Sequence, residues 1–471
     1  MKSLRLLRNL AFTILCSALP LSLSADSNQT DSLSAVLDGS LLPFSIEIEA
    51  AEFSLPTGLQ AFAGAIYKDK WIFLAGRTNG LHAFGNIGNN FPPRYQNTSV
   101  YVVDPATGIS LSRSLSDPTS NLSSDEIDAL SATASQFFQK KSTLYIVGGY
   151  GINTATGQIE TKSTLTGINL KKLLEWVEEG KPSFKKAIRQ VSHPYLQVTG
   201  GDLFQNSDHD PFLLILGQNF AGLYRDNANG IYTQQIRPFW LEDDGKHLSV
   251  FPADTTTTYP DYRRRDLNVS PIIHNDKPGY VALAGVFTLA GGVWTVPVII
   301  RPNGSSHEPD PSDSFTFKQA MNHYNCANFG LYSKHSNDMF VVLPGGISYG
   351  YFSGSDFLTD SEIPFINQVT TVKIDKHGTY SQFLMNGEYP YITSTGSNPG
   401  NQLLFGAEAL FLPAKHIHTY DNGVIDLDKL DCEPITIGYI IGGVMSTLGN
   451  TESASDSTAS PYVFKVKLRK K

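Results

Sequence analysis

The 471-residue sequence is poor in cysteine, in charge and in long apolar runs, and each shortage excludes a class of protein. The three cysteines, Cys16, Cys326 and Cys432, are too few for a disulfide framework, so the chain must rely on an ordinary hydrophobic core. Charged residues make up 17% of the chain, and the formal net charge is -8. A moderately acidic chain without a basic stripe lacks the surface that binds phosphate backbones, so we expect no nucleic-acid partner.

The one long apolar run stands at the N-terminus. Three basic residues among the first eight precede the apolar stretch 10–23, and small residues follow it. This order predicts a signal peptide over 1–24, and a flexible segment over 25–43 follows. We therefore expect an exported protein that is periplasmic, at the cell surface or secreted, has no membrane span and is a monomer.

Glycine and aromatic residues are abundant, with 40 glycines, 27 phenylalanines and 21 tyrosines. Short β-branched or aromatic runs alternate with turns rich in Gly, Pro, Asn and Asp, which is typical of strands joined by tight turns. Helical spacing of apolar residues occurs in Lys171–Glu179, where Leu173, Leu174 and Val177 share one side. The sequence therefore predicts an all-β fold with one helix.

The β pattern is built from six similar units. Each unit has a turn followed by an apolar run that ends in glycine, as in "WIFLAG", "TLYIVGG" and "MFVVLPGG". The first glycine after each run is at position 76, 148, 217, 285, 345 or 442. One strand precedes each glycine strand and two follow it, so each unit supplies four strands. Six such units predict a six-bladed β-propeller of four-stranded antiparallel blades over residues 44–471.

The two ends of the repeat region are complementary. The last unit offers three strands, within "QLLFGAEALFL", "TIGYIIGG" and "YVFKVKL", and so lacks a fourth. An additional strand, "FSIEIEA" (Phe44–Ala50), precedes the first complete unit. If this N-terminal strand joins the last blade as its outer strand, the ring closes and no blade edge stays unpaired.

The units resemble the kelch repeat family. "LYIVGGYG" is similar to its apolar strand and diglycine, and "SVYVVDPATG" is similar to the strand and turn that follow. The resemblance spans about Phe44–Leu468, with full diglycines in three of the six units and the family's later tryptophan mostly missing. It implies a propeller fold, and it does not indicate a subfamily.

The segment Gly346–Gly350 matches the G-x-S-x-G pattern that surrounds the nucleophile of many serine hydrolases. A nucleophile elbow requires a strand, a strained turn and then a helix. The residues that follow, "SYGYFSGSDF", have no helical period. We therefore interpret Ser348 as a turn residue between the second and third strands of a blade.

Propeller topology predicts which loops share a face. Loops that precede first strands, and loops between second and third strands, meet at one mouth of the central channel. They are "TNGLHAFGN", "GYGINTATG", "NFAGLYRD", "ISYGYF", "RRRD" and "HYNC". Arg263, Arg264 and Arg265 are the strongest candidates for ligand binding on this face. Arginine side chains bind carboxylates or sulfates through two hydrogen bonds, so an anionic sugar or a peptide carboxylate could dock there. The favoured alternative is a local network with Asp261 and Asp266 in which one arginine stacks on Tyr262.

His323, Tyr324 and Cys326 cluster before another first strand, similar to the kelch-type copper radical oxidases. That resemblance implies two histidines, two tyrosines and a cysteine, but no second histidine occupies an equivalent position. The nearest histidine pair, His416 and His418, falls after the first strand of the last unit, near the opposite face, without a third ligand. We therefore predict no metal and no cofactor, and unpaired, mostly buried thiols at Cys326 and Cys432.

Two functions from different classes fit these features. The first is a scaffold that binds a protein or a glycan at the channel mouth, and it draws on loop aromatics. These are Phe84, Tyr150, Tyr224, Tyr349, Tyr351 and Phe352. The second is a carbohydrate-active enzyme, a hydrolase, lyase or epimerase, using Arg263–Arg265, His323, Tyr324 and Glu408 at the same mouth. A copper-dependent oxidase is a third and weaker hypothesis. We favour binding over catalysis, because no spacing rule selects a catalytic set.

Overall fold

The computed structural model describes residues 33–471 except 83–89, 225–229, 254–256 and 290. The chain divides into two units, Met1–Ser32 and Leu33–Lys471, of which only the second is described. The predicted signal peptide and the first part of the predicted flexible segment therefore lie outside the described residues.

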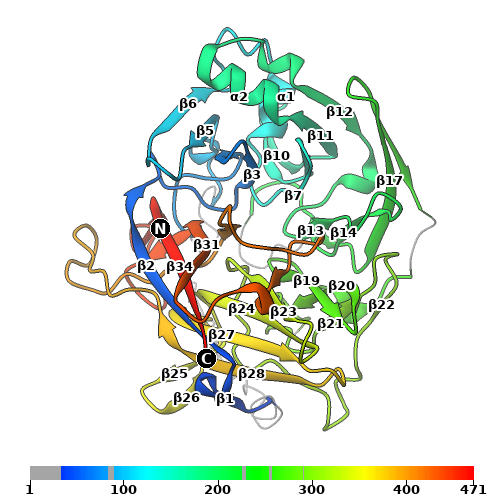
Figure 1. Cartoon of the computed structure of the whole chain (residues 1–471). Coiled ribbons are helices and arrows are strands. Elements are labelled where there is room, and N and C mark those ends of the chain that lie inside the picture. The colour runs from blue at the N-terminus through cyan, green and yellow to red at the C-terminus, as the bar shows by residue number, and fades with distance from the viewer. Residues whose placement is uncertain (1–32, 83–89, 225–229, 254–256, 290) are drawn as a thin grey trace, which may run out of the picture. The chain divides into compact units, whose positions relative to one another are not determined.

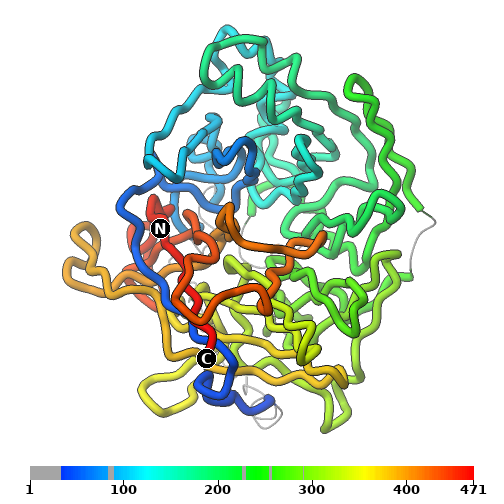
Figure 2. Tube along the Cα trace, in the orientation of Figure 1, coloured from blue at the N-terminus to red at the C-terminus, as the bar shows by residue number. Residues whose placement is uncertain are grey.

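Residues 33–471 form an all-β propeller in which five blades are four-stranded antiparallel sheets. Within this unit the sheets follow one another around a common centre, as the colours of the chain show (Figure 1, Figure 2). In sheet order, the first two of these blades are β3 (Ala63–Tyr67), β4 (Lys70–Leu74), β5 (Ser99–Val103) and β6 (Ser110–Ser114), and then β7 (Gln136–Lys140), β8 (Thr143–Val147), β11 (Thr164–Asn169) and β12 (Ile188–Ser192). The next two are β13 (Asp202–Phe204), β14 (Phe212–Ile215), β17 (Ile236–Asp243) and β18 (Leu248–Pro252), and then β19 (Asn268–His274), β20 (Lys277–Leu283), β21 (Val298–Ile300) and β22 (Ser306–His307). The fifth combines β29 (Ala409–Pro413), β31 (Ile435–Gly442) and β34 (Tyr462–Lys470) with the N-terminal strand β2 (Phe44–Ser54).

A further sheet has six strands. Four are antiparallel neighbours, β23 (Phe329–Ser333), β24 (Asp338–Ile347), β27 (Phe365–Ile374) and β28 (Tyr380–Glu388). Two short strands extend this sheet in parallel fashion, β1 (Val36–Asp38) beside β28 and β30 (Ile425–Asp426) beside β23. The short strand β1 therefore covers the edge of the sheet that β28 would otherwise expose.

Four short hairpins project from the larger sheets. They are β9 (Tyr150–Asn153) with β10 (Gln158–Thr161), β15 (Gln218–Asn219) with β16 (Ile231–Tyr232), β25 (Gly350–Ser353) with β26 (Asp356–Thr359), and β32 (Val444–Ser446) with β33 (Ser457–Ala459). Each hairpin connects the second and third strands of its sheet. All four therefore emerge at the same end of their sheets.

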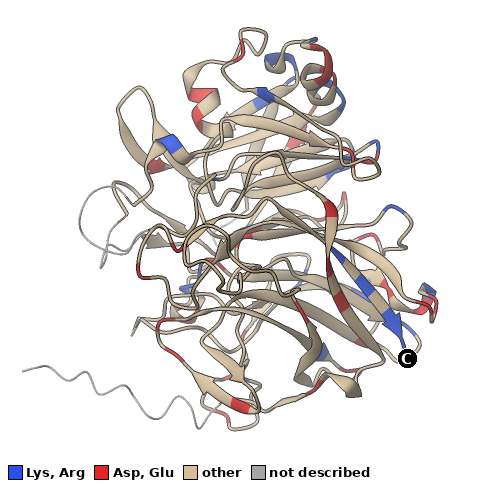
Figure 3. Cartoon of the chain, turned by 90° about the vertical axis from the view of Figure 1, so that its left-hand side faces the viewer, with Lys and Arg blue, Asp and Glu red and all other residues tan. Residues whose placement is uncertain are grey.

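Strand β2 lies antiparallel to β34, and the two run side by side in Figure 1. Glu47 is opposite Lys467 in the register. Two ion pairs cross the strands, Lys465 with Glu52 at 2.5 Å and Lys467 with Glu49 at 2.6 Å. Figure 3 shows the basic stretch of this ribbon ending at the C-terminus. The two strands are 11 and nine residues long. Their pairing brings residues from the two ends of the described chain into one sheet.

Two consecutive positive φ angles occur at the C-terminal end of the second strand of each larger sheet, directly after the strand or, in β24 and β31, among its last residues. The pairs are Ala75–Gly76, Gly148–Gly149, Leu216–Gly217, Ala284–Gly285, Gly345–Gly346 and Gly442–Gly443. The second residue is always glycine, which adopts positive φ without the penalty of a Cβ atom. The sequence alignment on the first glycine is therefore wrong by one residue in the three diglycine units. The equivalent glycines there are Gly149, Gly346 and Gly443.

These glycines also join neighbouring sheets. Hydrogen bonds run from Gly76 N to Ala132 O, Gly149 N to Val198 O, Gly217 N to Arg264 O, Gly346 N to Phe405 O and Gly443 N to Leu59 O, at 2.8–3.2 Å. Between the β19 and β23 sheets, the Asn268 side chain donates to the His323 carbonyl oxygen, and its Oδ1 accepts from the Cys326 N–H. Main-chain polar groups that are buried between the sheets thus acquire partners.

Two α-helices are described. The predicted helix is confirmed as α2 (Leu170–Glu179), where Asn169 caps the N-terminus and Gly180, with φ 74°, ends it. The second helix, α1 (Ser124–Leu130), was not predicted. Its start carries a capping box in which Ser123 and Glu126 each bond the main-chain N–H of the other. That four-residue pattern is visible in the sequence and could have revealed the helix.

Candidate functional site

Six residues, each just before the first strand of a larger sheet, surround the centre of the propeller and define the inner ring. They are Ala61, Ala134, Gly200, Asp266, Asn325 and Glu408, and all have positive φ. Main-chain hydrogen bonds join Ala134 N to Ala61 O, Gly200 N to Ala134 O, Asp266 N to Gly200 O, Glu408 N to Asn325 O and Ala61 N to Glu408 O. Their lengths are 2.7–3.2 Å. The inner ring therefore holds residues from distant parts of the chain in fixed mutual positions.

The inner ring has two chemically different halves. Ala61, Ala134 and Gly200 are small, whereas the next three positions around the ring are Asp266, Asn325 and Glu408. Five of these six conformations belong to residues other than glycine, which adopt positive φ only when the surrounding structure enforces it. One side of the ring thus leaves space, and the other side presents polar groups.

A cavity of about 800 Å³, counted with the open space at its mouth, lies against the inner ring. We call it the mouth cavity. Its floor includes Asp266, Glu408 and two ring-adjacent residues, Arg265 and Tyr324. Each of the six predicted mouth loops contributes at least one lining residue. These are Leu81 and His82, Tyr150, Phe220 and Tyr224, Ile347, Arg265 and Asp266, and Tyr324.

One side of the mouth cavity is an aromatic wall formed by His82, Phe91, Tyr150, Phe220 and Tyr224. Phe91 packs edge-to-face on Tyr150 at 5.5 Å and on Tyr224 at 5.3 Å between ring centroids. The His82 ring lies 4.7 Å from that of Tyr224. Mutual packing fixes the rings, so the wall offers a preformed aromatic surface.

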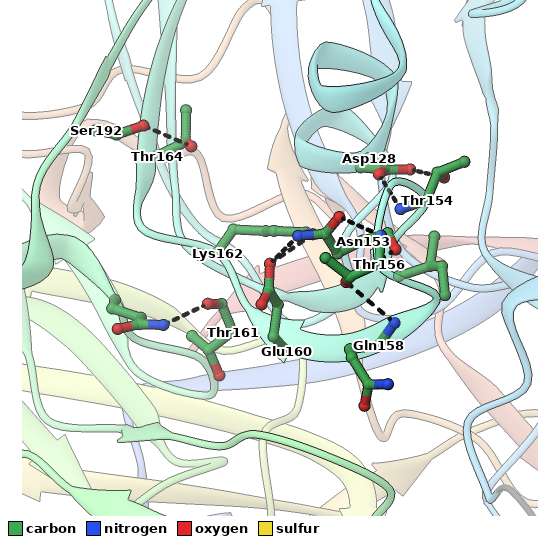
Figure 4. Close-up of polar contacts among 12 residues, drawn as sticks. Asp128, Asn153, Thr154, Thr156, Gln158, Glu160, Thr161, Lys162, Thr164 and Ser192 are labelled. Carbon is green, nitrogen blue, oxygen red and sulfur yellow. Dashed lines mark hydrogen bonds and ion pairs between the residues drawn. The ribbon is translucent and has the colours of Figure 1, made fainter.

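The hairpin that carries Tyr150 is held by polar contacts on both sides (Figure 4). Asp128, at the end of α1, accepts bonds from the Thr154 N–H and hydroxyl group, both at 2.7 Å. Glu160 accepts from Asn153 at 2.9 Å, and Lys162 lies 3.4 Å from the same carboxylate oxygen. These bonds fix the hairpin on which Tyr150 stands.

Three of the seven sequence-predicted site residues, Arg265, Tyr324 and Glu408, line the mouth cavity. Burial raises the pKa of Glu408 to about 8, and the nearby Asp266 carboxylate adds to the shift. A hydrogen bond from Asn325 and the Arg265 charge act in the opposite direction. Burial likewise raises the pKa of Tyr324, with further increases from Asp266 and Glu408. The surroundings of the floor thus favour the protonated form of the Glu408 carboxyl group and the neutral form of the Tyr324 phenol.

Of the three predicted arginines, only Arg265 lines the mouth cavity. It forms an ion pair with Asp266, and its Nε and Nη2 donate to Tyr232 and Tyr224 at 3.1 and 2.9 Å. The local network was therefore correct for Asp266.

The rest of that predicted network was wrong. Arg264 is fully buried and pairs with Glu308, while Asp261 offers it only a main-chain oxygen. Arg263 stacks on Tyr232 at 4.0 Å, not on Tyr262, because hairpin β15–β16 brings Tyr232 over the guanidinium group.

His323 and Tyr349 do not line the mouth cavity. His323 is fully buried, its Nδ1 lies 2.6 Å from the Gly345 carbonyl oxygen, and burial lowers its pKa to about 4. Tyr349 is half-buried, and its N–H donates to Asn322. Ser348, also fully buried, donates to the Gly350 carbonyl oxygen and is followed by strand β25, not by a helix. Its hydroxyl group is therefore part of a turn.

Sequence reasoning also missed part of the site. Asp266 was considered only as a partner for arginine, and His82, Phe91 and Phe220 were not selected. Of the loop aromatics, Tyr150 and Tyr224 line the mouth cavity, Tyr349, Tyr351 and Phe352 do not, and Phe84 lies outside the described residues. The floor residues Arg265, Asp266, Tyr324 and Glu408 all stand just before the first strand of a sheet. Their shared position in the repeat is a signal that could have located the floor.

A second cavity, the central channel, lies below the inner ring and measures about 1750 Å³ with its open ends. It shares Ala61, Ala134, Gly200 and Glu408 with the mouth cavity. Half-buried phenylalanines, among them Phe137 and Phe204, line it. Burial raises the pKa of Asp202, in the same wall, to about 7. Glu408 is thus the ring carboxyl group that lines both cavities.

Among the described residues, no three His, Cys, Asp or Glu side chains come together as a metal site. No helix in this part of the chain is long and apolar enough to cross a membrane. Both described cysteines are free; Cys326 is buried as predicted, but Cys432 is exposed, so its predicted burial is wrong. The turn before β31 places Cys432 at the surface.

Comparison with known proteins finds no matching family model and no matching curated protein. Among solved structures, one described as "Structure of YjhT" aligns with 88% of this chain and 98% of its own chain. The aligned residues are 12% identical, with a TM-score of 0.44. A likeness at this level assigns no function.

Proposed function

We propose that the propeller binds a carbohydrate in the mouth cavity. The observation that carries this proposal is the pairing of a preformed aromatic wall with a polar floor inside one concave site. Sugar rings present an apolar face that packs on aromatic rings and hydroxyl groups that require hydrogen-bond partners. Asp266 and Glu408, which line the same cavity as the wall, supply such partners.

The test is a glycan array probed with protein lacking residues 1–24, followed by calorimetry on each hit. Tyr224→Ala removes a wall ring and should weaken binding at least tenfold, whereas Tyr224→Phe keeps the ring and should retain most of it. Tyr349→Ala is the matched control, because Tyr349 is a loop tyrosine outside the cavity. Equal losses in the Tyr224 and Tyr349 variants would contradict the assignment to this cavity, and an array without hits would count against carbohydrate binding.

Catalysis on the bound sugar is the second candidate function. The specific observation in its favour is the position of Glu408 in the cavity beside Tyr324, where burial raises the pKa of the carboxyl group and favours its protonated form. A protonated carboxyl group can act as a general acid toward a glycosidic or ring oxygen. Turnover of an array hit that is lost in Glu408→Gln, while affinity persists, would establish catalysis. Binding without turnover leaves the scaffold function.

We also infer that the propeller has six blades and closes through β2. The antiparallel part of the six-stranded sheet serves as the sixth blade, and the six positive-φ pairs support this count. The β2–β34 pairing supports closure, since the first and last parts of the chain then share a blade. The kelch resemblance, export and the monomeric state remain predictions.

A further inference from the structure

We propose that the mouth cavity selects an uncharged saccharide over an acidic one. This inference rests on the proposed carbohydrate function and names its substrate class. The geometry behind it is the pairing of every arginine in the run Arg263–Arg265 with groups of the protein itself.

Arg265 is the cation of the floor, and its three nitrogens are already engaged. Nη1 pairs with Asp266, Nε donates to Tyr232, and Nη2 donates to Tyr224. The guanidinium group also lies 5.0 Å from the Phe287 ring centroid. A ligand carboxylate would have to displace Asp266 to gain a bidentate contact.

Arg264 and Arg263 do not add positive charge to the cavity surface. Arg264 pairs with Glu308, donates to the Val296 carbonyl oxygen at 2.7 Å and is fully buried. Arg263 donates to the Phe287 carbonyl oxygen and stacks on Tyr232. Neither arginine lines the mouth cavity.

The floor therefore has more acidic than basic groups. Among the described lining residues, the carboxyl groups are Asp266 and Glu408, and the guanidinium group is Arg265. With Glu408 protonated the floor is close to neutral, and with Glu408 ionised it is negative. Among the described residues of the floor, an acidic sugar meets no unpaired guanidinium group in either state, and it faces repulsion in the second. A neutral sugar carries no charge for the floor to repel, so its binding has no such electrostatic cost in either state.

Asp266→Asn is the decisive variant, because it releases Arg265 from its carboxylate partner. Asparagine tolerates positive φ, and Asp266 has φ 50°, so the inner ring keeps its conformation. Asp261→Asn is the matched control: it removes one negative charge from the same segment at an exposed position outside the cavity. Thermal unfolding of both variants verifies that each is folded.

The experiment measures affinity for pairs of neutral oligosaccharides and their uronic-acid counterparts, on the array and by calorimetry. The wild-type protein should bind the neutral member at least tenfold more tightly, about 1.4 kcal/mol. Asp266→Asn should reduce or reverse this preference, and Asp261→Asn should leave it unchanged. Tighter wild-type binding of the acidic members, or an unchanged preference in folded Asp266→Asn, overturns the inference but leaves the carbohydrate function intact. Failure of both classes to bind counts against the carbohydrate function itself.

Discussion

Asn325 donates a hydrogen bond of 2.8 Å from Nδ2 to Oε2 of Glu408, and the Glu408 N–H donates at 2.7 Å to the Asn325 carbonyl oxygen. The two residues occupy neighbouring positions of the inner ring, 83 residues apart in the sequence. The ring geometry thus sets the distance between the Glu408 carboxyl group and the side chain that stabilises its ionised form.

Removing the Asn325 side chain should raise the pKa of Glu408 above about 8, because the bond from Asn325 is one of the contributions that lower it. Asn325→Gly is the suitable change, since glycine accepts the positive φ at this position. The infrared band of the protonated carboxyl group, followed across alkaline pH, reports the titration. Glu408→Gln identifies the band by its loss. A titration that stays in place or moves to lower pH would contradict the assigned contact.

Replacing Glu408 with glutamine should stabilise the protein increasingly as pH rises from about 4.5 to about 8. The folded state holds the Glu408 proton up to about pH 8, whereas the unfolded state releases it near 4.5, so ionisation opposes folding across this window. At about 1.4 kcal/mol per pH unit, this window corresponds to a gain on the order of 5 kcal/mol at alkaline pH, and we expect little gain below pH 4.5. Denaturant unfolding at both ends of the window measures the gain, and an equal effect at both pH values would disprove this origin.

The strands could be predicted from the sequence because their signals are local. The apolar runs and the glycines that follow them placed β4, β8, β24 and β31, and glycine marked the C-terminal end of each of these strands to within a few residues. The diglycine units were misaligned by one residue because both residues of the pair have positive φ, so the sequence alone does not show which glycine corresponds to Gly76.

The site was predicted less well because it depends on side-chain direction. Adjacent residues His323 and Tyr324 were both candidates, yet only Tyr324 reaches the cavity. In a regular strand, the alternation of side chains would show which of the two faces the cavity. The alternation of the strand that follows cannot be extended back to them, because the positive φ of Asn325, 27°, interrupts it. The aromatic wall depends on long connections that meet from separate sheets, and no spacing within one unit reveals those contacts.

A glycine-to-alanine substitution should be much more costly at the sheet-to-sheet turns than at an open turn. At Gly443, with φ 85°, an added Cβ would lie 2.5 Å from the Ala407 carbonyl oxygen. At Gly157, with φ 70°, no atom lies within 4 Å of such a Cβ. We expect Gly443→Ala to lower the unfolding free energy by about 3 kcal/mol or more, and Gly157→Ala by about 1 kcal/mol, the backbone cost alone. Similar losses of unfolding free energy in the two variants would show that the contact between neighbouring sheets at Gly443 is not closely packed.

Closure through β2 can be tested by a covalent link between β2 and its neighbour in the sheet, β34. Glu47 and Lys467 are Cα partners in the register, so Glu47→Cys with Lys467→Cys should form a disulfide on oxidation. The exposed Cys432 is changed to serine to remove a competing thiol.

Peptide mapping should find the 47–467 link, and thermal unfolding should move to higher temperature, since the bond connects segments 420 residues apart. Glu52→Cys with Arg469→Cys provides the control. The register places Arg469 opposite Ser45, seven residues from position 52, or about 23 Å along a strand. A disulfide in the control pair, or none in the register pair, would mean that β2 does not hold this register and that the propeller closes in another way.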